Sequence, residues 1–172
     1  MERVETYLKY HVGWAADYDI KYLLDTIKNY QEKWGLDLNP DFQRGHVWTP
    51  EQRVAFLEYW LSGGVVNPIY LNWPENTDKK KGYSDFVIVD GLQRLTTFMM
   101  FANDEISIFN EIKFSDFENP LRMPSIPICK NHLNTKKEVL EWYYFMNSGG
   151  TPHSETELVR VKKMIETESD EK

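Results

Sequence analysis

The sequence predicts a single α+β domain in which a small mixed sheet is surrounded by about four helices. The chain has 172 residues, the size of one domain, and 41% of them are apolar, which is enough for a compact core. Segments with helical spacing of apolar residues alternate with short runs typical of strands. Because no repeat, low-complexity segment or linker interrupts this pattern, we expect one domain over residues 1–165 and an acidic tail over 166–172.

Apolar residues that recur every three or four positions predict the helices. The predicted helical segments are residues 18–34, 50–61, 91 to about 103, 135–146, and a last helix that begins at Ser154. The candidate caps are Asp17 or Asp19 with Gly35 for the first helix, and Thr49 with Gln52 in a capping box for the second.

Four or five short strands are expected to form the sheet. Residues 65–73 predict one strand, which Pro68 interrupts early, and the apolar run 86–89 predicts a second strand. Alternating apolar residues predict strand structure over 106–114, and residues 125–129 predict a further short strand.

Composition excludes several classes of protein. With 27 acidic and 20 basic residues the net charge is −7, which argues against indiscriminate coating of nucleic acid. No apolar run approaches the roughly 18 residues of a membrane helix, so we expect a cytoplasmic protein with no membrane partner. Cys129 is the only cysteine, and its spacing to His132 has no second pair to complete a zinc site. We therefore expect no metal site in the protein.

The segment VIVDGLQRLTTF, residues 87–98, carries the sharpest local signal. A buried strand leads through Asp90 and Gly91 to a helix start, where backbone N–H groups and the positive end of the helix dipole are available. Gln93 and Arg94 lie in the first turn, where an amide and a guanidinium can meet an anion. The alternative is that Asp90 caps the helix and Arg94 forms a structural ion pair.

Two further segments gather polar residues between predicted helices. In one, Gln43, Arg44 and His46 lie in a turn that Phe42 and Trp48 can anchor in the core, although a simple polar loop is the alternative.

The other is FMNSGGTPHSETEL, residues 145–158, where Gly149 and Gly150 would let the backbone approach a ligand closely. Ser154 and Glu157 have capping-box spacing. A plain corner between two helices is the alternative for this segment.

Taken in order, PDFQRGHVW, VIVDGLQRLTT and FMNSGGTPHSETEL resemble the N-terminal domain of the GmrSD-type, modification-dependent restriction enzymes over about residues 20–158. That resemblance implies a ParB/sulfiredoxin-like fold. It also implies binding, and at most weak hydrolysis, of a nucleoside triphosphate accompanied by Mg²⁺, through a middle motif that usually reads DGQQR.

The resemblance assigns roles to individual residues. The candidate catalytic residues are Asp90, Gln93 and Arg94, and the candidate nucleotide-binding residues are Gln43, Arg44, Gly91, Thr96, Asn147, Gly149, Gly150 and Thr151. Asp90 would orient a metal-bound or attacking water, and Arg94 would stabilise developing phosphoryl charge. Residues 147–151 would close over the nucleotide.

Departures from the family pattern predict weak turnover. Leu92 replaces the first glutamine of the motif, Phe145 lies where an arginine is frequent, and His153 replaces a leucine. The restriction enzymes continue into an HNH nuclease domain, and this chain ends at Lys172, so we expect a sensor or regulatory domain that does not cut DNA alone.

Two other functions stay open at this point. One is a non-enzymatic module that binds a separate nuclease subunit or acts as a decoy in the conflict between phage and restriction systems. The other is a DNA-binding or DNA-cleaving ParB-like domain. For the latter, Asp90 with Glu111 and Lys113 has the spacing of some metal-dependent nucleases, but acid-x-Lys also occurs elsewhere in the chain by chance.

Overall fold

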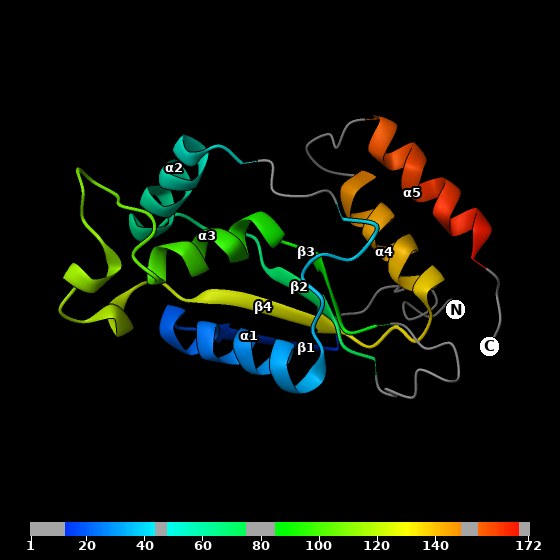
Figure 1. The fold of residues 1–172 in the computed structure, drawn as a ribbon, viewed down its shortest axis with the longest axis horizontal. Coiled ribbons are helices and arrows are strands. Elements are labelled where there is room, and N and C mark those ends of the chain that lie inside the picture. Colours follow the sequence, from blue (N-terminus) through cyan, green and yellow to red (C-terminus); the bar gives the residue numbers. More distant parts are fainter. Residues whose placement is uncertain (1–12, 44–47, 75–84, 149–154, 169–172) are drawn as a thin grey trace, which may run out of the picture.

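A four-stranded mixed sheet forms the centre of the computed structural model, which describes residues 13–43, 48–74, 85–148 and 155–168 (Figure 1). In chain order its elements are β1 (Trp14–Tyr18), α1 (Ile20–Trp34), α2 (Pro50–Leu61), β2 (Ile69–Asn72), β3 (Val87–Asp90), α3 (Leu92–Ala102), β4 (Ile126–Asn131), α4 (Lys136–Ser148) and α5 (Glu155–Thr167). Two short 3-10 helices, residues 114–116 and 120–122, precede β4. The predicted α+β class is confirmed. The described residues contain five α-helices, one at each of the five predicted helical segments, although the overall expectation was about four.

The strand order in the sheet is β1-β4-β2-β3. Strands β2 and β4 are parallel, with Ile69 opposite Ile128, whereas β1 is antiparallel to β4 and β3 is antiparallel to β2. Of the described strands, the last in sequence, β4, is therefore an inner strand of the sheet, and β3 and β1 lie at its two edges.

Side chains alternate between the two faces of the sheet, and each face has its own core. Along β3, Ile88 packs into the larger cluster, while Val87 and Val89 pack into the smaller one. The larger cluster contains buried residues of α1, α2 and α3, among them Leu23, Leu57 and Leu95. The smaller contains buried residues of α4 and α5, among them Leu140 and Val161.

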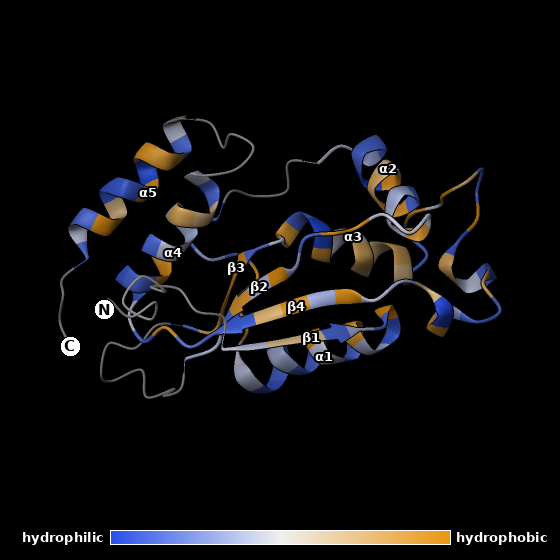
Figure 2. Cartoon of the chain, turned by 180° about the vertical axis from the view of Figure 1, so that it is seen from behind, coloured by the Kyte–Doolittle hydropathy of each residue, from blue (hydrophilic) through white to orange (hydrophobic). Residues whose placement is uncertain are grey.

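Hydropathy follows this layered arrangement. In Figure 2, β3 is mostly hydrophobic and β4 changes from hydrophobic to hydrophilic along its length, whereas α1 and α5 mix hydrophilic and hydrophobic residues, as helices with one face on the core do. The longest of the described helices, α1, has 15 residues, and among the described helices none has the length and apolar character needed to cross a membrane.

Local capping signals determine where the first two helices begin and end. Asp19 accepts a hydrogen bond from the backbone N–H of Tyr22, and Gly35 ends α1 in the left-handed conformation with φ of 70°. Thr49 and Gln52 form the predicted capping box at the start of α2. These predictions are confirmed. The sequence could predict the caps because a cap is a contact between residues that are close in sequence.

The strand predicted over residues 106–114 is wrong. The chain reverses there, with an isolated bridge between Ile108 and Ile112, and residues 109–111 have φ of 43°, 64° and 81°. Residues in the left-handed region turn the chain, so the alternating apolar residues belong to a tight turn and the 3-10 helix 114–116.

Two further differences concern the ends of the described chain. Strand β1 was not predicted, since as an edge strand it is largely exposed and lacks an alternating apolar pattern. Helix α5 extends to Thr167, into the segment predicted as an acidic tail.

Candidate functional site

The junction between β3 and α3 depends on Gly91. This residue is the N-cap of α3 with φ of 96°, and a Cβ added there would lie 3.0 Å from Nη2 of Arg94 and 3.1 Å from Cα of Ile69. Glycine is the residue that tolerates both the left-handed backbone and the crowding. The N-cap of α3 is Gly91 and no side chain among the described residues caps this helix, so the alternative in which Asp90 is the helix cap is wrong.

The ion pair of Arg94 that the same alternative expected is confirmed, and its partner is Asp90. Oδ2 of Asp90 accepts from Nη2 of Arg94 at 2.9 Å, and the same Nη2 donates to the carbonyl of Pro68 at 3.0 Å. Their side chains are partly buried, 33% exposed for Asp90 and 17% for Arg94. Nε of Arg94 is buried and finds no acceptor among the described residues. The predicted cation is therefore present at the helix start, already held by a carboxylate and a carbonyl.

Two glutamines link the first and middle motifs. Nε2 of Gln43 donates to the carbonyls of Val89 at 2.8 Å and Ile88 at 3.3 Å, at the end of β3. Oε1 of Gln93 accepts from the backbone N–H of Trp48 at 3.2 Å. The structure thus brings Gln43 and Trp48 to the β3–α3 junction, although both lie more than forty residues from it in sequence.

The segment before Gln43 runs along the outer edge of β3. The backbone of Asp37 donates to Phe86 at 2.9 Å and accepts from Ile88 at 3.0 Å. Gln43 continues this edge with its side chain, because its amide takes the place of a backbone donor. The segment 37–43 therefore acts as an extension of the sheet that ends at the candidate site.

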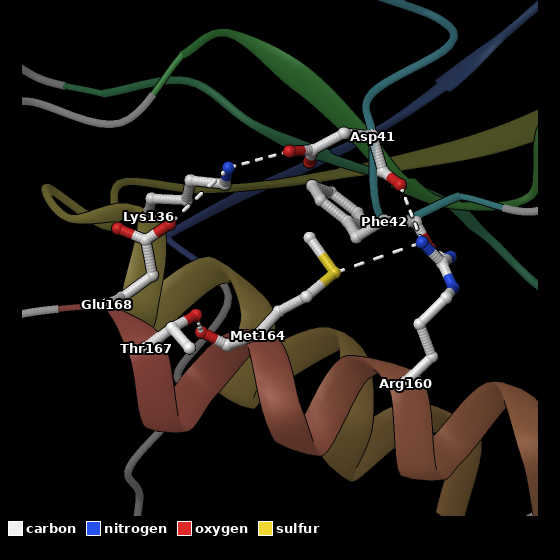
Figure 3. A network of polar contacts seen from close by, with 7 residues as sticks. All are labelled: Asp41, Phe42, Lys136, Arg160, Met164, Thr167 and Glu168. Carbon is white, nitrogen blue, oxygen red and sulfur yellow. Dashed lines mark hydrogen bonds and ion pairs between the residues drawn. The ribbon is translucent and has the colours of Figure 1, made fainter.

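Helices α4 and α5 hold this segment in place (Figure 3). Arg160 of α5 donates to the carbonyls of Asp41 at 2.9 Å and Phe42 at 2.8 Å, and to Oε1 of Glu157 at 2.6 Å. Lys136 at the start of α4 donates to Oδ2 of Asp41 at 2.7 Å. Sequence patterns did not indicate a role for Arg160 or Lys136, since their partners are about a hundred residues away.

Tyr70 is a further residue of this region that no sequence pattern indicated. It lies opposite Asp90 in the register of β2 and β3, and its ring meets Trp142 of α4 edge to face at 6.0 Å. Burial raises the pKa of its phenol, and the charges of Cys129 and Asp90 raise that pKa further. A neutral phenol therefore lies close to the Asp90–Arg94 pair at neutral pH.

Other predicted site residues have different surroundings. Asn147 is only 7% exposed, and its amide donates to the carbonyl of Tyr143 in its own helix at 2.7 Å. Leu92 is 5% exposed and belongs to the larger core, and Thr96 is partly buried on α3. Four predicted residues lie outside the described part of the chain: Arg44, Gly149, Gly150 and Thr151.

Metal-binding side chains do not gather anywhere in the described residues. No group of three or more His, Cys, Asp and Glu side chains there could hold a metal ion. The thiol of Cys129 is buried, which raises its pKa, as does the nearby charge of Asp17. Nδ1 of His132 lies 2.7 Å from the carbonyl of Trp73. Cys129 is therefore packed in the interior, and His132 contacts a backbone carbonyl.

The fold and this junction define a small α+β domain with a cation and an amide, Arg94 and Gln93, in the first turn of a glycine-initiated helix. A helix start of this kind is suited to anions. Residues 20–125 match the family model of the GmrSD restriction endonuclease N-terminal domain. The match covers more than half of the 172 residues, so the chain belongs to this family. It includes β2, β3 and α1 to α3, and it ends before β4. Comparisons with curated proteins and with solved structures gave no significant match.

Proposed function

We propose that the chain is a nucleoside-triphosphate-binding sensor or regulatory domain whose phosphate site is the β3–α3 junction. The observation that carries the proposal is a helix start that no side chain among the described residues caps, with Arg94 and Gln93 in its first turn. Gln43 is hydrogen-bonded to the end of the strand that leads into it. Uncapped N–H groups and the helix dipole favour an anion at this position. Membership of the restriction-enzyme family supports a role in restriction.

The environment of Arg94 supports anion binding at this junction. Its Nε is buried with no acceptor among the described residues, and an unsatisfied buried donor costs about 1–3 kcal/mol. A phosphate oxygen at the helix start would supply an acceptor to this guanidinium. Both described contacts of Arg94 use Nη2, so an anion would compete mainly with the carboxylate of Asp90.

Asp90 is the residue that would position a water molecule in the proposed hydrolysis. Its carboxylate could hold a magnesium-bound or attacking water while Arg94 stabilises charge on the phosphoryl group. In the nucleotide-free arrangement Asp90 is paired with Arg94, so both must rearrange before they can act separately. We therefore propose binding with slow turnover.

Titration calorimetry with the common nucleoside triphosphates and Mg²⁺ tests the binding site. We expect Arg94→Ala to weaken binding at least about tenfold, the effect of losing one charge-assisted hydrogen bond. Arg94→Lys, which keeps the charge without the planar fork, should have an intermediate effect. The control is Arg122→Ala, because Arg122 is an exposed arginine on a 3-10 helix away from the junction.

Two results would contradict the proposal: no binding heat with any triphosphate, or equal losses in Arg94→Ala and Arg122→Ala. Thermal unfolding of each variant identifies a loss of binding that results from unfolding.

We propose a separate HNH-type nuclease subunit as the partner through which the domain acts, and the family membership supports this proposal. Mixing the chain with the nuclease encoded by a neighbouring reading frame should give a complex on size-exclusion chromatography. Plasmid cleavage by that nuclease should then depend on triphosphate. Two separate peaks, or cleavage unaffected by this chain, would contradict the regulatory role.

A further inference from the structure

We infer that Arg160 of α5 is a positioning residue that presets the amide of Gln43 at the proposed phosphate site. This inference rests on the proposed nucleotide function, and the geometry behind it lies in the turn at residues 40–43. The backbone N–H of Gln43 donates to the carbonyl of Pro40 at 2.9 Å, which closes the turn. The direction of the Gln43 side chain therefore depends on how this turn is held.

Arg160 donates hydrogen bonds to two consecutive carbonyls of the turn. Nη1 donates to Asp41 at 2.9 Å and Nη2 donates to Phe42 at 2.8 Å, so one planar guanidinium fixes two successive peptide units (Figure 3). Glu157, one turn earlier on α5, accepts from Nη2 at 2.6 Å and orients the fork. A lysine has no such planar pair of donors.

The ring of Phe42 supplies the opposing contact. It is 3% exposed and packs against Tyr143 of α4 with ring centroids 5.2 Å apart. With the ring buried on one side and the carbonyl held on the other, the peptide before Gln43 has little freedom to rotate. The Gln43 amide then meets Val89 at 2.8 Å, directly before Asp90.

The neighbouring ion pair of Lys136 provides a matched contrast. Lys136 also contacts Asp41, but it does so at the carboxylate, and both side chains are about half exposed, 43% and 58%. Exposed ion pairs contribute little, and this one leaves the backbone of the turn free. Arg160 should therefore control Gln43, whereas Lys136 should not.

Amide exchange in the nucleotide-free full chain tests the positioning directly. The sequence has four glutamines, so a sample labelled with ¹⁵N in glutamine side chains gives four NH₂ pairs, and Gln43→Asn assigns that of Gln43. We expect Arg160→Ala and Arg160→Lys to accelerate exchange of the Gln43 NH₂ by about tenfold or more. Lys136→Ala should leave it unchanged, and exposed Gln31 is the internal reference.

Unchanged Gln43 exchange in Arg160→Lys would overturn the inference, as would equal acceleration of all four glutamines. If Arg160→Ala does not fold, Arg160→Lys carries the test.

Calorimetry with triphosphate and Mg²⁺ then links the positioning to binding. Arg160→Lys should weaken binding about tenfold in the wild-type background and have no further effect in Gln43→Ala. An equal loss in both backgrounds would overturn the inference, since Arg160 would then act independently of Gln43. If the wild type binds no triphosphate, the proposed function fails, and the exchange measurement alone decides the role of Arg160.

Discussion

Two largely buried cations, Arg94 and Lys130, lie near opposite ends of β2 and have opposite surroundings. Arg94 contacts the carbonyl of Pro68, just before β2, and pairs with the carboxylate of Asp90. Lys130 of β4 lies opposite Leu71, toward the other end of β2. Among the described residues it has no carboxylate partner within ion-pair distance.

Aromatic rings surround Lys130 instead. Its Nζ lies 4.3 Å from the ring centroid of Trp14, 4.5 Å from that of Tyr30 and 4.6 Å from that of Trp73, and it donates to the Tyr30 hydroxyl at 2.6 Å. The residue is 7% exposed, and this burial lowers its pKa to about 8.

Under the proposed function, this difference separates a cation that would bind a ligand from one that only stabilises the structure. Arg94 lies at a partly open position, where the proposed function requires it to exchange the carboxylate of Asp90 for another anion. Lys130 is enclosed by rings whose faces attract cations and repel anions. The presence of a buried positive charge is therefore not enough to identify a ligand site in this protein, because Lys130 has the charge without access for an anion.

The largest expected effect is a loss of stability at the β3–α3 junction, which positions Arg94. Gly91→Ala combines a left-handed backbone with a Cβ about 3 Å from Ile69, and we expect it to destabilise the fold by about 4 kcal/mol. Gly35→Ala is the control, because Gly35 also has positive φ but nothing lies within 4 Å of an added Cβ. That variant should lose about 1–2 kcal/mol in urea unfolding. Equal losses would contradict the importance of crowding at the junction.

Leu92→Gln has the next largest expected effect. It restores the glutamine that the resemblance predicts, but residue 92 lies in the larger core, where an amide has no prepared partner. We expect a loss of about 3 kcal/mol in urea unfolding and no gain in triphosphate affinity. Tighter binding would show that residue 92 reaches the anion.

Lys130→Met tests whether the buried Lys130 makes the stability of the protein depend on pH. The folded-state pKa of about 8 is below the ordinary value of 10.5, so between these values the unfolded chain binds more protons and stability rises with pH. The buried thiol of Cys129, whose pKa is raised, and Tyr30, whose pKa is also raised, oppose this rise.

The difference between wild type and Lys130→Met isolates the lysine. We expect the wild type to gain about 2 kcal/mol over the variant between pH 8 and pH 10, measured by urea unfolding at each pH. Parallel curves would mean that Lys130 titrates as an exposed lysine does.

Asp90→Asn has the smallest expected effect on stability. The pair is partly exposed and joins residues i and i+4, so its loss should change unfolding free energy by less than about 1 kcal/mol. Binding should respond more, because the variant releases Arg94 and removes a negative charge. We expect magnesium-free pyrophosphate to bind about tenfold more tightly by calorimetry. Weaker binding would indicate that the carboxylate itself contacts the ligand through a proton or an ion.

Elements specified by neighbouring residues could be predicted from the sequence. The caps at Asp19 and Thr49 and the strand–glycine–helix junction at Gly91 are signals within a few positions. The turn at 109–111 was missed because non-glycine residues rarely adopt positive φ, and Asn110, a residue type that tolerates it, is the sole signal within these three positions.

The candidate site was predicted only in part, because its contacts join distant segments. The motif residues Asp90, Gln93 and Arg94 lie within one strand–helix junction, so their proximity follows from local structure. Arg160 contacts Phe42 across 118 positions of sequence, and Tyr70 reaches Asp90 through strand pairing. Helical spacing assigned no special role to either residue.

The position of β4 has a consequence for synthesis of the protein. Strand β1 hydrogen-bonds to β4 and β2 also depends on it, yet β4 is translated after both, with about a hundred residues between β1 and its partner. On the ribosome the earlier strands emerge without their central neighbour, so the sheet closes only once residue 131 has left the exit tunnel. A nascent chain that pauses before that point would expose β1 and β2 to chaperones.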